Sequence, residues 1–275
     1  MKKLTQEEIR AKQIQMLDYI DELCTRKNLT YYLAYGTLIG AIRHKGYIPW
    51  DDDIDLWILR EDYDAFKEAI QAEKKYDFVD TESNPNFRLD FAKVVDTSVL
   101  INETGAKEKS TGLFIDIFPL DAFGDTQEEV KRNLKRISKR RKKFYFCNFS
   151  LKALDGSLVK RFIKFHIVVW HKFLLSFCSI PKVIKKYHKL LSETNKKYTK
   201  YIGYFDSPYQ NPDKYVYEKE DFVVAKGWFE GKEYNIPKNY DAILTKFYGE
   251  YMTLPPVEEQ KNHGLEAYSK EDLSE

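Results

Sequence analysis

"GTLIGAIRHKGYIPWDDDIDLWIL", residues 36–59, is the stretch that decides the fold, and it holds four aspartates within five positions. Acidic side chains this close repel one another, so their density requires an explanation. From residue 53 the sequence alternates: Ile54, Leu56 and Ile58 fall on one face, and Asp53 and Asp55 on the other. Such period-two alternation predicts a β-strand over residues 53–59.

Asp53 and Asp55 have the spacing of a metal site. Carboxylates at positions i and i+2 of a strand share a face, roughly 6.6 Å apart at the backbone, and can converge on one cation or a close pair. Mg²⁺ is usually held by one or two carboxylates and completed by water and phosphates. Asp116 in "FIDIF" has apolar neighbours, where an unpaired acid is costly, and is the predicted third ligand. Mg²⁺, as one ion or two, is the expected cofactor, with Mn²⁺ as a possible substitute.

The residues around these acids leave alternatives open. Gly36 and Thr37 precede a short predicted helix, where a glycine lets the backbone approach a phosphate and a hydroxyl can bind it. Asp51 and Asp52 can shape the turn, contact metal-bound solvent, or do neither. A bare D-x-D string can also be a solvated acidic loop that binds no metal.

Composition limits the class of protein. The 275 residues are 43% hydrophobic and 32% charged, with a net charge of +2, which is typical of a globular chain and does not indicate nucleic acid as a partner. Cys24, Cys147 and Cys178 lie far apart, which favours a reduced compartment over disulfides or a zinc site. "MKKLTQEEIRAK" has no apolar run of a signal peptide. These observations predict a cytoplasmic protein.

The remaining pattern predicts strands and helices around one sheet. Thr5 and Glu8 have capping-box spacing at the start of a helix, and another helix is expected over "EDYDAFKEAIQAE". Strands are expected over residues 31–35, 87–96 and 112–121, which gives an α/β or α+β pattern.

The segment from residue 124 to 200 is different in character. Nine Lys or Arg lie between Lys131 and Lys143, and residues 157–180 are apolar but broken by charges, which excludes a membrane span. The segment can be a solvated face on an ordinary core helix. It can also lie on an anionic membrane surface, with these aromatic and aliphatic residues at the headgroups: Phe162, Ile163, Phe165, Trp170 and Phe173.

The Gly-Thr pair, the D-x-D strand and the later Asp resemble the pattern of the DNA-polymerase-β-like nucleotidyltransferases. More narrowly, "YGTLIGAIRHKGYIPWDDDIDLWILREDYDAF", "FIDIFPLD" and "IPKNYDAILTKFYGEYMTLPP" resemble the LicD family of bacterial phosphorylcholine transferases and fukutin-type transferases. The resemblance covers residues 30–123 and 225–265. It implies an α+β fold with a nucleotidyltransferase-like mixed β-sheet core flanked by helices, at residues 1–123. A helical, basic insertion would occupy residues 124–200, and residues 201–275 would complete the active site.

The resemblance implies a reaction and a set of residues. LicD enzymes typically transfer phosphocholine from CDP-choline to a hydroxyl of a cell-surface glycan precursor, such as a teichoic acid, capsule or lipopolysaccharide. Asp53, Asp55 and Asp116 would hold Mg²⁺, and Asp116 would also help to deprotonate the acceptor. The other expected substrate-binding residues are Gly36, Thr37, Arg43, His44, Lys45, Lys93 and His263.

Arg43 can bind the diphosphate bidentately. Lys93 lies on a predicted strand and is either a phosphate ligand or a solvent-facing lysine. A transferred choline would need aromatic faces, because its quaternary ammonium forms no hydrogen bond. The candidates are Trp50, Trp228, Phe229, Tyr215 and Tyr217.

Other functions fit the same acids. The enzyme could transfer glycerol- or ribitol-phosphate from its CDP derivative, or it could transfer a nucleotide. A non-catalytic, membrane-associated binding module is the alternative outside the enzymes. The favoured hypothesis is the phosphocholine transferase, cytoplasmic and peripheral on the inner face of the membrane, with a lipid-linked glycan as acceptor.

Overall fold

The computed structural model describes residues 1–84, 87, 89–103, 112–148, 161–162, 165–170, 173, 180–205, 211–260, 262 and 264–270. Its backbone forms two compact units, one made of Met1–Leu120 with Tyr217–Glu275 and the other of Asp121–Val216. The expected division of the chain into three parts stays a prediction.

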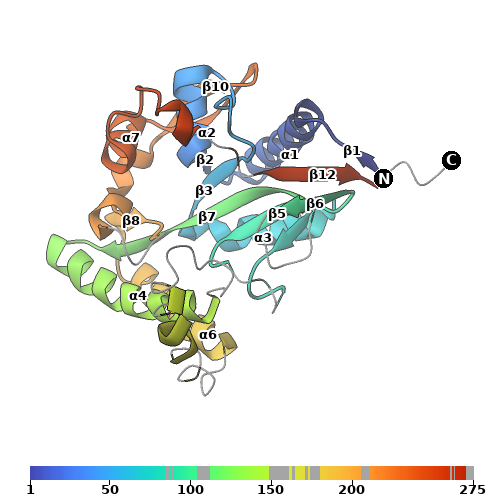
Figure 1. The fold of residues 1–275 in the computed structure, drawn as a ribbon. Helices are drawn as coiled ribbons and strands as arrows, with labels where there is room; N and C mark the ends of the chain where they lie inside the picture. The colour runs from blue at the N-terminus through green and yellow to red at the C-terminus, as the bar shows by residue number, and fades with distance from the viewer. Residues whose placement is uncertain are drawn as a thin grey trace. The chain divides into compact units, whose positions relative to one another are not determined.

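The first unit is built on a mixed β-sheet with the strand order β2-β3-β7-β5-β4. Strands β3 and β7 pair in parallel, and the other neighbours in this order pair antiparallel. β7 lies between β3 and β5 (Figure 1). The strand bounds are Tyr31–Leu33 (β2), Asp55–Leu59 (β3), Asp77–Val79 (β4), Ala92–Asp96 (β5) and Leu113–Gly124 (β7). This sheet, with its helices, confirms the predicted α+β class.

Helices flank the sheet. Helix α1, Gln6–Lys27, begins with the predicted capping box, in which the Thr5 hydroxyl accepts from Glu8 N–H and the Glu8 carboxylate accepts from Thr5 N–H. It ends at Asn28, whose left-handed conformation (φ 53°) closes the last turn. Helix α3, Arg60–Glu73, follows β3 directly and buries Tyr63, Phe66, Ala69 and Ile70.

The segment between β2 and β3 differs from the expectation. The strand predicted over residues 31–35 ends at Leu33, and the short helix α2 (Tyr35–Ile39) already begins at Tyr35. It is followed by one turn of π-helix, η1, over Gly40–His44, which we call the π-turn. Tyr35 has φ 41°, a conformation that a bulky side chain rarely adopts. Gly40 permits the tight π-turn, because a Cβ there would lie 2.4 Å from the Gly46 carbonyl oxygen. The strand predicted over 87–96 begins only at Ala92.

The chain returns to the first unit after residue 216. Here β10 and β11 form an antiparallel hairpin that leads into helix α7, and β12 pairs antiparallel with both β1 and β6. In Figure 1 strand β12 lies beside β1 at the N-terminus. The bounds are Lys2–Lys3 (β1), Val99–Glu103 (β6), Tyr217–Glu218 (β9), Lys219–Phe222 (η4), Val224–Phe229 (β10), Lys232–Pro237 (β11), Tyr240–Tyr248 (α7), Val257–Glu259 (η5) and Leu265–Ser269 (β12).

The second unit is mainly helical in its described part. Helix α4 (Gln127–Asn148) packs against α6 (Ile180–Asn195), and the short strand β8 (Tyr201–Gly203) pairs with the end of β7; a 3-10 turn, η3, spans Pro212–Tyr215. The buried Arg141 donates hydrogen bonds to the hydroxyls of Tyr187 and Tyr204, each at 3.3 Å.

The surface predicted to contact a membrane lies partly in this unit. Phe162, Phe165, Trp170 and Phe173 are exposed, the first by 65% and Trp170 by 62%, whereas Ile163 lies outside the described residues. None of the helices in the described part of the chain combines the length and apolarity needed to cross a bilayer.

Candidate active site

Three aspartates from two strands meet at one point of the first unit. Asp55, at the start of β3, is the register partner of Asp116 in β7, because these two strands run in parallel. Asp53 precedes β3, and one carboxylate oxygen from each of Asp53, Asp55 and Asp116 lies within 4.8 Å of the others. The structure therefore brings together the three residues that the sequence proposed as metal ligands.

A second acidic group adjoins the first. Asp51, Asp52 and Asp53 also place carboxylate oxygens within 4.8 Å of one another, so Asp53 belongs to both groups. Asp52 is buried, and its carboxylate accepts the backbone N–H of Leu265 at 3.2 Å. The sequence left the roles of Asp51 and Asp52 open. The hydrogen bond of Asp52 connects the turn over residues 48–53, which we call the acidic turn, to strand β12.

Lys93 places a positive charge beside these acids. It lies on β5 as the register partner of Asp116, and its Nζ is 3.1 Å from Asp116 Oδ1. The same ammonium lies 3.0 Å from the ring centroid of Phe114, and the residue is only 7% exposed. Lys93 is thus directed into the site. The alternative interpretation, a lysine that faces solvent, does not hold.

The electrostatics of the site favour a bound cation. Burial raises the pKa of Asp55 well above its ordinary value, and the charges of Asp53, Asp116 and Asp51 raise it further, whereas Lys93 opposes the shift. Burial likewise raises the pKa of Asp51, against a hydrogen bond with Asp53. Among the described residues the two acidic groups hold five carboxylates, and the charge of Lys93 offsets only part of their negative charge. Carboxylate oxygens that converge in this way fit the hard-cation preference of Mg²⁺.

Gly36 and Thr37 contact the acidic residues. The Thr37 hydroxyl accepts the backbone N–H of Asp55 at 2.9 Å, which fixes the start of β3. A Cβ on Gly36 would lie 2.6 Å from Asp51 Oδ2, so a side chain at this position would collide with that carboxylate. In this structure both residues position aspartates; their predicted contact with phosphate stays a prediction.

Arg10 stabilises the acidic turn by hydrogen bonds to its backbone. Its Nη2 donates to the carbonyl oxygens of Ile48, Pro49 and Asp51, at 3.2, 3.1 and 2.7 Å, and its guanidinium lies over the Tyr47 ring. Nothing in the sequence distinguished this arginine, because its partners are backbone carbonyls about forty positions away along the chain.

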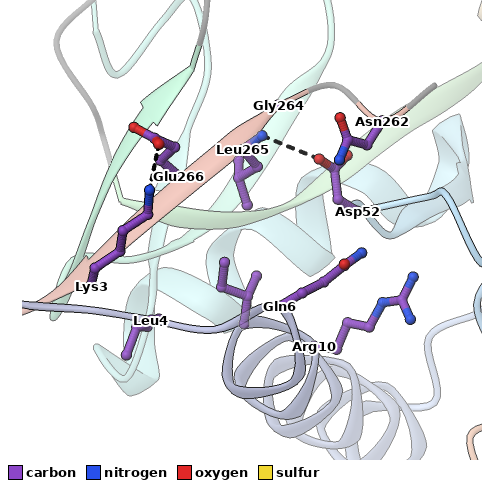
Figure 2. Close-up of a pocket in the computed structure, with 10 residues that line it drawn as sticks. Lys3, Leu4, Gln6, Arg10, Asp52, Asn262, Gly264, Leu265 and Glu266 are labelled. Atoms are coloured by element: carbon purple, nitrogen blue, oxygen red, sulfur yellow. Dashed lines mark hydrogen bonds and ion pairs between the residues drawn. The ribbon is translucent and has the colours of Figure 1, made fainter.

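A cavity of about 510 Å³ lies beside this turn, between the start of α1 and β12 (Figure 2). Gln6 and Arg10 line it from the helix, and Asp52 and Asn262 line it from the opposite side. Lys3 and Glu266 form an ion pair at its edge. The cavity borders the acidic turn through Asp52.

The basic residues after α2 are partly engaged within the protein. Arg43 Nη1 donates to the carbonyls of Tyr251 and Thr253, and its Nε donates to His44 Nε2 at 2.9 Å. Burial and the Arg43 charge lower the pKa of His44. Lys45 is exposed, and its left-handed conformation ends the π-turn. Trp50 lies edge-on to the His44 ring, 6.4 Å between centroids. The predicted diphosphate contacts of these residues stay predictions.

The remaining predicted substrate-binding residues are scattered. Trp228, on β10, is 51% exposed, and none of the described contacts joins it to the acidic residues. Phe229 is fully buried against Tyr47. Tyr215 belongs to the second unit, and His263 lies outside the described residues.

Other aromatic residues, which the sequence did not single out, lie closer to the acids. The Tyr35 ring contacts Trp57 and Phe118, at centroid distances of 4.9 and 5.1 Å. Tyr248, at the end of α7, is 43% exposed. Burial raises the pKa of its hydroxyl, and the charges of Asp55, Tyr217, Asp51 and Asp53 raise it further.

Comparison with known proteins identifies the family. A family model described as "LicD/FKTN/FKRP, nucleotidyltransferase domain" matches residues 28–156. The chain is 34% identical over 275 aligned residues to lipopolysaccharide cholinephosphotransferase LicD of Haemophilus influenzae, with 98% of this chain and 99% of that protein covered. The chain belongs to the LicD family. The resemblance found in the sequence motifs is therefore confirmed.

Two further relatives match shorter stretches of the chain. An uncharacterized protein of Rickettsia typhi is 30% identical over 113 residues, which cover 41% of this chain and 35% of that protein. One of Rickettsia prowazekii is 48% identical over 48 residues, 18% of each chain. The LicD model itself spans the described elements from β2 to β7, and so includes the acidic residues and Lys93.

Proposed function

We propose that this LicD-family protein is a phosphocholine transferase that moves phosphocholine from CDP-choline to a hydroxyl of a cell-surface glycan precursor. The observation that carries the proposal is the convergence of Asp53, Asp55 and Asp116 in a chain aligned over nearly its full length with a lipopolysaccharide cholinephosphotransferase. The acceptor class includes lipopolysaccharide, capsule and teichoic acid precursors.

The three aspartates would hold Mg²⁺, or Mn²⁺ in its place. Asp53 belongs to both acidic groups, so it would supply a ligand oxygen whether one ion or two are bound. The ion would neutralise charge on the diphosphate and on the leaving oxygen. Lys93, whose ammonium lies at the edge of the acidic group, would add positive charge for a phosphate oxygen.

The reaction is a displacement at phosphorus. The acceptor oxygen forms a bond to the phosphorus that carries choline, the bond from that phosphorus to the bridging oxygen breaks, and CMP leaves with the electron pair. The hydroxyl proton passes to the Asp116 carboxylate, which lies next to Asp55 across the parallel strands. The protein's own contribution is largely to position donor and acceptor.

A second candidate retains the site and changes the donor. Glycerol- or ribitol-phosphate could be transferred from the corresponding CDP-polyol, because a cation held by the acidic residues would bind the diphosphate part that all these donors share. Nucleotidyl transfer uses the same metal chemistry at the other phosphorus. A binding module without catalysis is less favoured, because an acidic cluster without a bound cation destabilises the fold.

Peripheral membrane contact is a separate part of the proposal. The exposed Phe162, Trp170 and Phe173, next to many lysines and arginines, support weak binding to anionic lipid on the cytoplasmic side. Sedimentation with anionic liposomes should show binding that salt weakens. Absence of binding at low salt would remove this part alone.

The function is tested by phosphorus NMR of the protein with CDP-choline and Mg²⁺, with and without an extract of lipid-linked glycan precursor. We expect metal-dependent release of CMP and a new phosphodiester resonance, both lost in Asp55→Asn. Asp64→Asn, which changes an exposed carboxylate of α3, is the matched control and should react normally. Turnover of CDP-glycerol or CDP-ribitol in place of CDP-choline would support the second candidate. Release of phosphocholine, with CMP joined to the acceptor, would indicate nucleotidyl transfer.

A further inference from the structure

Two adjacent rows of side chains lie on one face of the central sheet. The first, which we call the acidic row, consists of Asp55, Asp116 and Lys93, which are register partners across β3, β7 and β5. Two residues further along the same strands, β3 carries Trp57 and β7 carries Phe118, again as register partners. Residues two apart on a strand share a face, so these aromatic residues follow the acidic row directly.

Phe91 completes this second row. It precedes β5 by one residue, and its ring lies 4.5 Å from that of Phe118 between centroids. We call Trp57, Phe118 and Phe91 the aromatic row. It is separated from the acidic row by about 6.6 Å, two residues of strand rise.

Further rings cover the aromatic row. The Tyr35 ring contacts Trp57 and Phe118 edge-on. The ring of Phe247, in α7, lies 5.3 Å from the Tyr35 ring between centroids. The Tyr248 ring lies 4.7 Å from the Phe247 ring between centroids. Trp57 and Phe118 are buried, but Tyr35, Phe91 and Phe247 are each only half-buried, so parts of their surfaces remain accessible.

Two observations distinguish this group from ordinary core packing. Tyr35 holds its ring against the aromatic row from a backbone with φ 41°, a strained conformation of the kind that concentrates at ligand sites. Trp57 Nε1 is buried and has no hydrogen-bond partner among the described residues, although a buried donor is normally paired. A core built only for stability would require neither.

We propose that Tyr35, Phe91 and Phe247 form the subsite for the quaternary ammonium of the donor, with Trp57 and Phe118 as its floor. The inference rests on the proposed function. A phosphate bound at the acidic row is separated from the choline nitrogen by an oxygen and an ethylene unit, which matches the step of two strand residues between the rows. Aromatic faces attract a desolvated cation but give little to the hydroxyls of a glycerol or ribitol chain. The subsite therefore selects choline over the polyols.

The test compares CDP-choline with its uncharged isostere, CDP-3,3-dimethylbutanol, in which a carbon replaces the ammonium nitrogen. Donor kcat/KM is measured for the wild-type protein, Tyr35→Leu and Phe247→Leu at fixed acceptor. We expect the wild type to prefer the cation by about ten- to thirtyfold, and both variants to lose most of that preference. Because the preference is a ratio within one protein sample, a partly unfolded variant does not alter it.

Two controls complete the design. Tyr35→Phe keeps the ring and should retain the preference. Tyr76→Leu removes a half-buried tyrosine that packs on Tyr19 outside this group, and should also retain it. Calorimetric titration with phosphocholine gives a readout independent of turnover, and we expect binding to weaken about tenfold in Tyr35→Leu.

The outcomes separate the two proposals. If the wild type uses CDP-choline but the Leu variants keep the full preference for the cation, the subsite is wrong and the proposed function stands. If the wild type uses both donors equally well, cation recognition is absent and the subsite is again wrong. If the wild type neither turns over CDP-choline nor binds phosphocholine, but uses a CDP-polyol, both proposals are wrong.

Discussion

Asp55→Asn should stabilise the metal-free protein while it abolishes activity. The wild-type Asp55 is half-buried beside Asp53 and Asp116, and burial together with these charges raises the pKa of its carboxylate well above the ordinary value. An asparagine keeps the shape of the side chain and removes the charge. The chain would thus be more stable without the group that its proposed chemistry requires.

The size of the effect follows from the geometry. The carboxylate oxygens lie within 4.8 Å of one another. Two unit charges at that separation repel by about 1 kcal/mol in water and about 3–4 kcal/mol at an effective dielectric constant near 20. Asp55 has two such neighbours, and its attraction to Lys93 offsets part of the repulsion. We therefore expect a gain of about 1–3 kcal/mol, or a rise in Tm of about 3–9 °C for a chain of this size.

Differential scanning calorimetry in a metal chelator measures this gain. Because the folded-state pKa of Asp55 is raised, stability of the metal-free wild type should fall as the pH rises from the unfolded-state value of about 4 toward the folded one. Asp55→Asn should lose this dependence. Saturating Mg²⁺ should raise the Tm of the wild type more than that of the variant. A lower Tm for Asp55→Asn than for the wild type in chelator, with Asp64→Asn unchanged, would refute the reasoning.

Three further predictions concern other parts of the first unit. Arg10→Lys keeps the charge but cannot reproduce the planar contact with three carbonyls, so kcat should fall about ten- to a hundredfold. Arg26→Lys, on the surface, is the control and should leave kcat unchanged. If Arg10→Lys is as active as the wild type, the acidic turn does not need Arg10 to keep its conformation. Burial opposes ionisation of Asp80, but hydrogen bonds from Lys67 and Ser83 outweigh burial and lower its pKa. Asp80→Asn should therefore lower the free energy of unfolding by about 1–3 kcal/mol at pH 7. Thermal melts should show this difference between variant and wild type shrinking below about pH 4. Burial raises the pKa of Cys24 to about 12, so peptide mapping after iodoacetamide should find this thiol modified only in unfolded protein.

The acidic residues could be predicted from the sequence because their signal is local. Alternation around Asp55 and the apolar neighbours of Asp116 reveal two strands, and the chemistry of carboxylates then requires a partner for both. Asp55 and Asp116 are direct neighbours because β3 pairs in parallel with β7. The alternation of apolar and polar residues does not specify which strands pair. The same limit applies to Lys93, whose orientation toward Asp116 is set by the register of β5.

The aromatic residues show where sequence reasoning fails. With 20 tyrosines and 18 phenylalanines, no single ring can be distinguished by composition, and Trp228 was only one of several aromatic candidates. "DLW" and "DIF" each place an aromatic residue two positions after an aspartate, which is the signal that could have been used. Its meaning depends on Tyr35, whose unusual backbone conformation has no sequence signature, because glycine and asparagine are the usual residues at positive φ.

The parallel pairing of β3 with β7 also has a consequence for how the chain acquires its structure. Parallel strands cannot be joined by a tight turn, and here α3, β4, β5 and β6 all intervene before β7 can add beside β3. Contacts that close such long loops form late in folding. A nascent chain therefore carries its aspartates apart until most of the sheet exists, and a truncated product that ends before residue 113 would contain the DDDID sequence without a site for a cation.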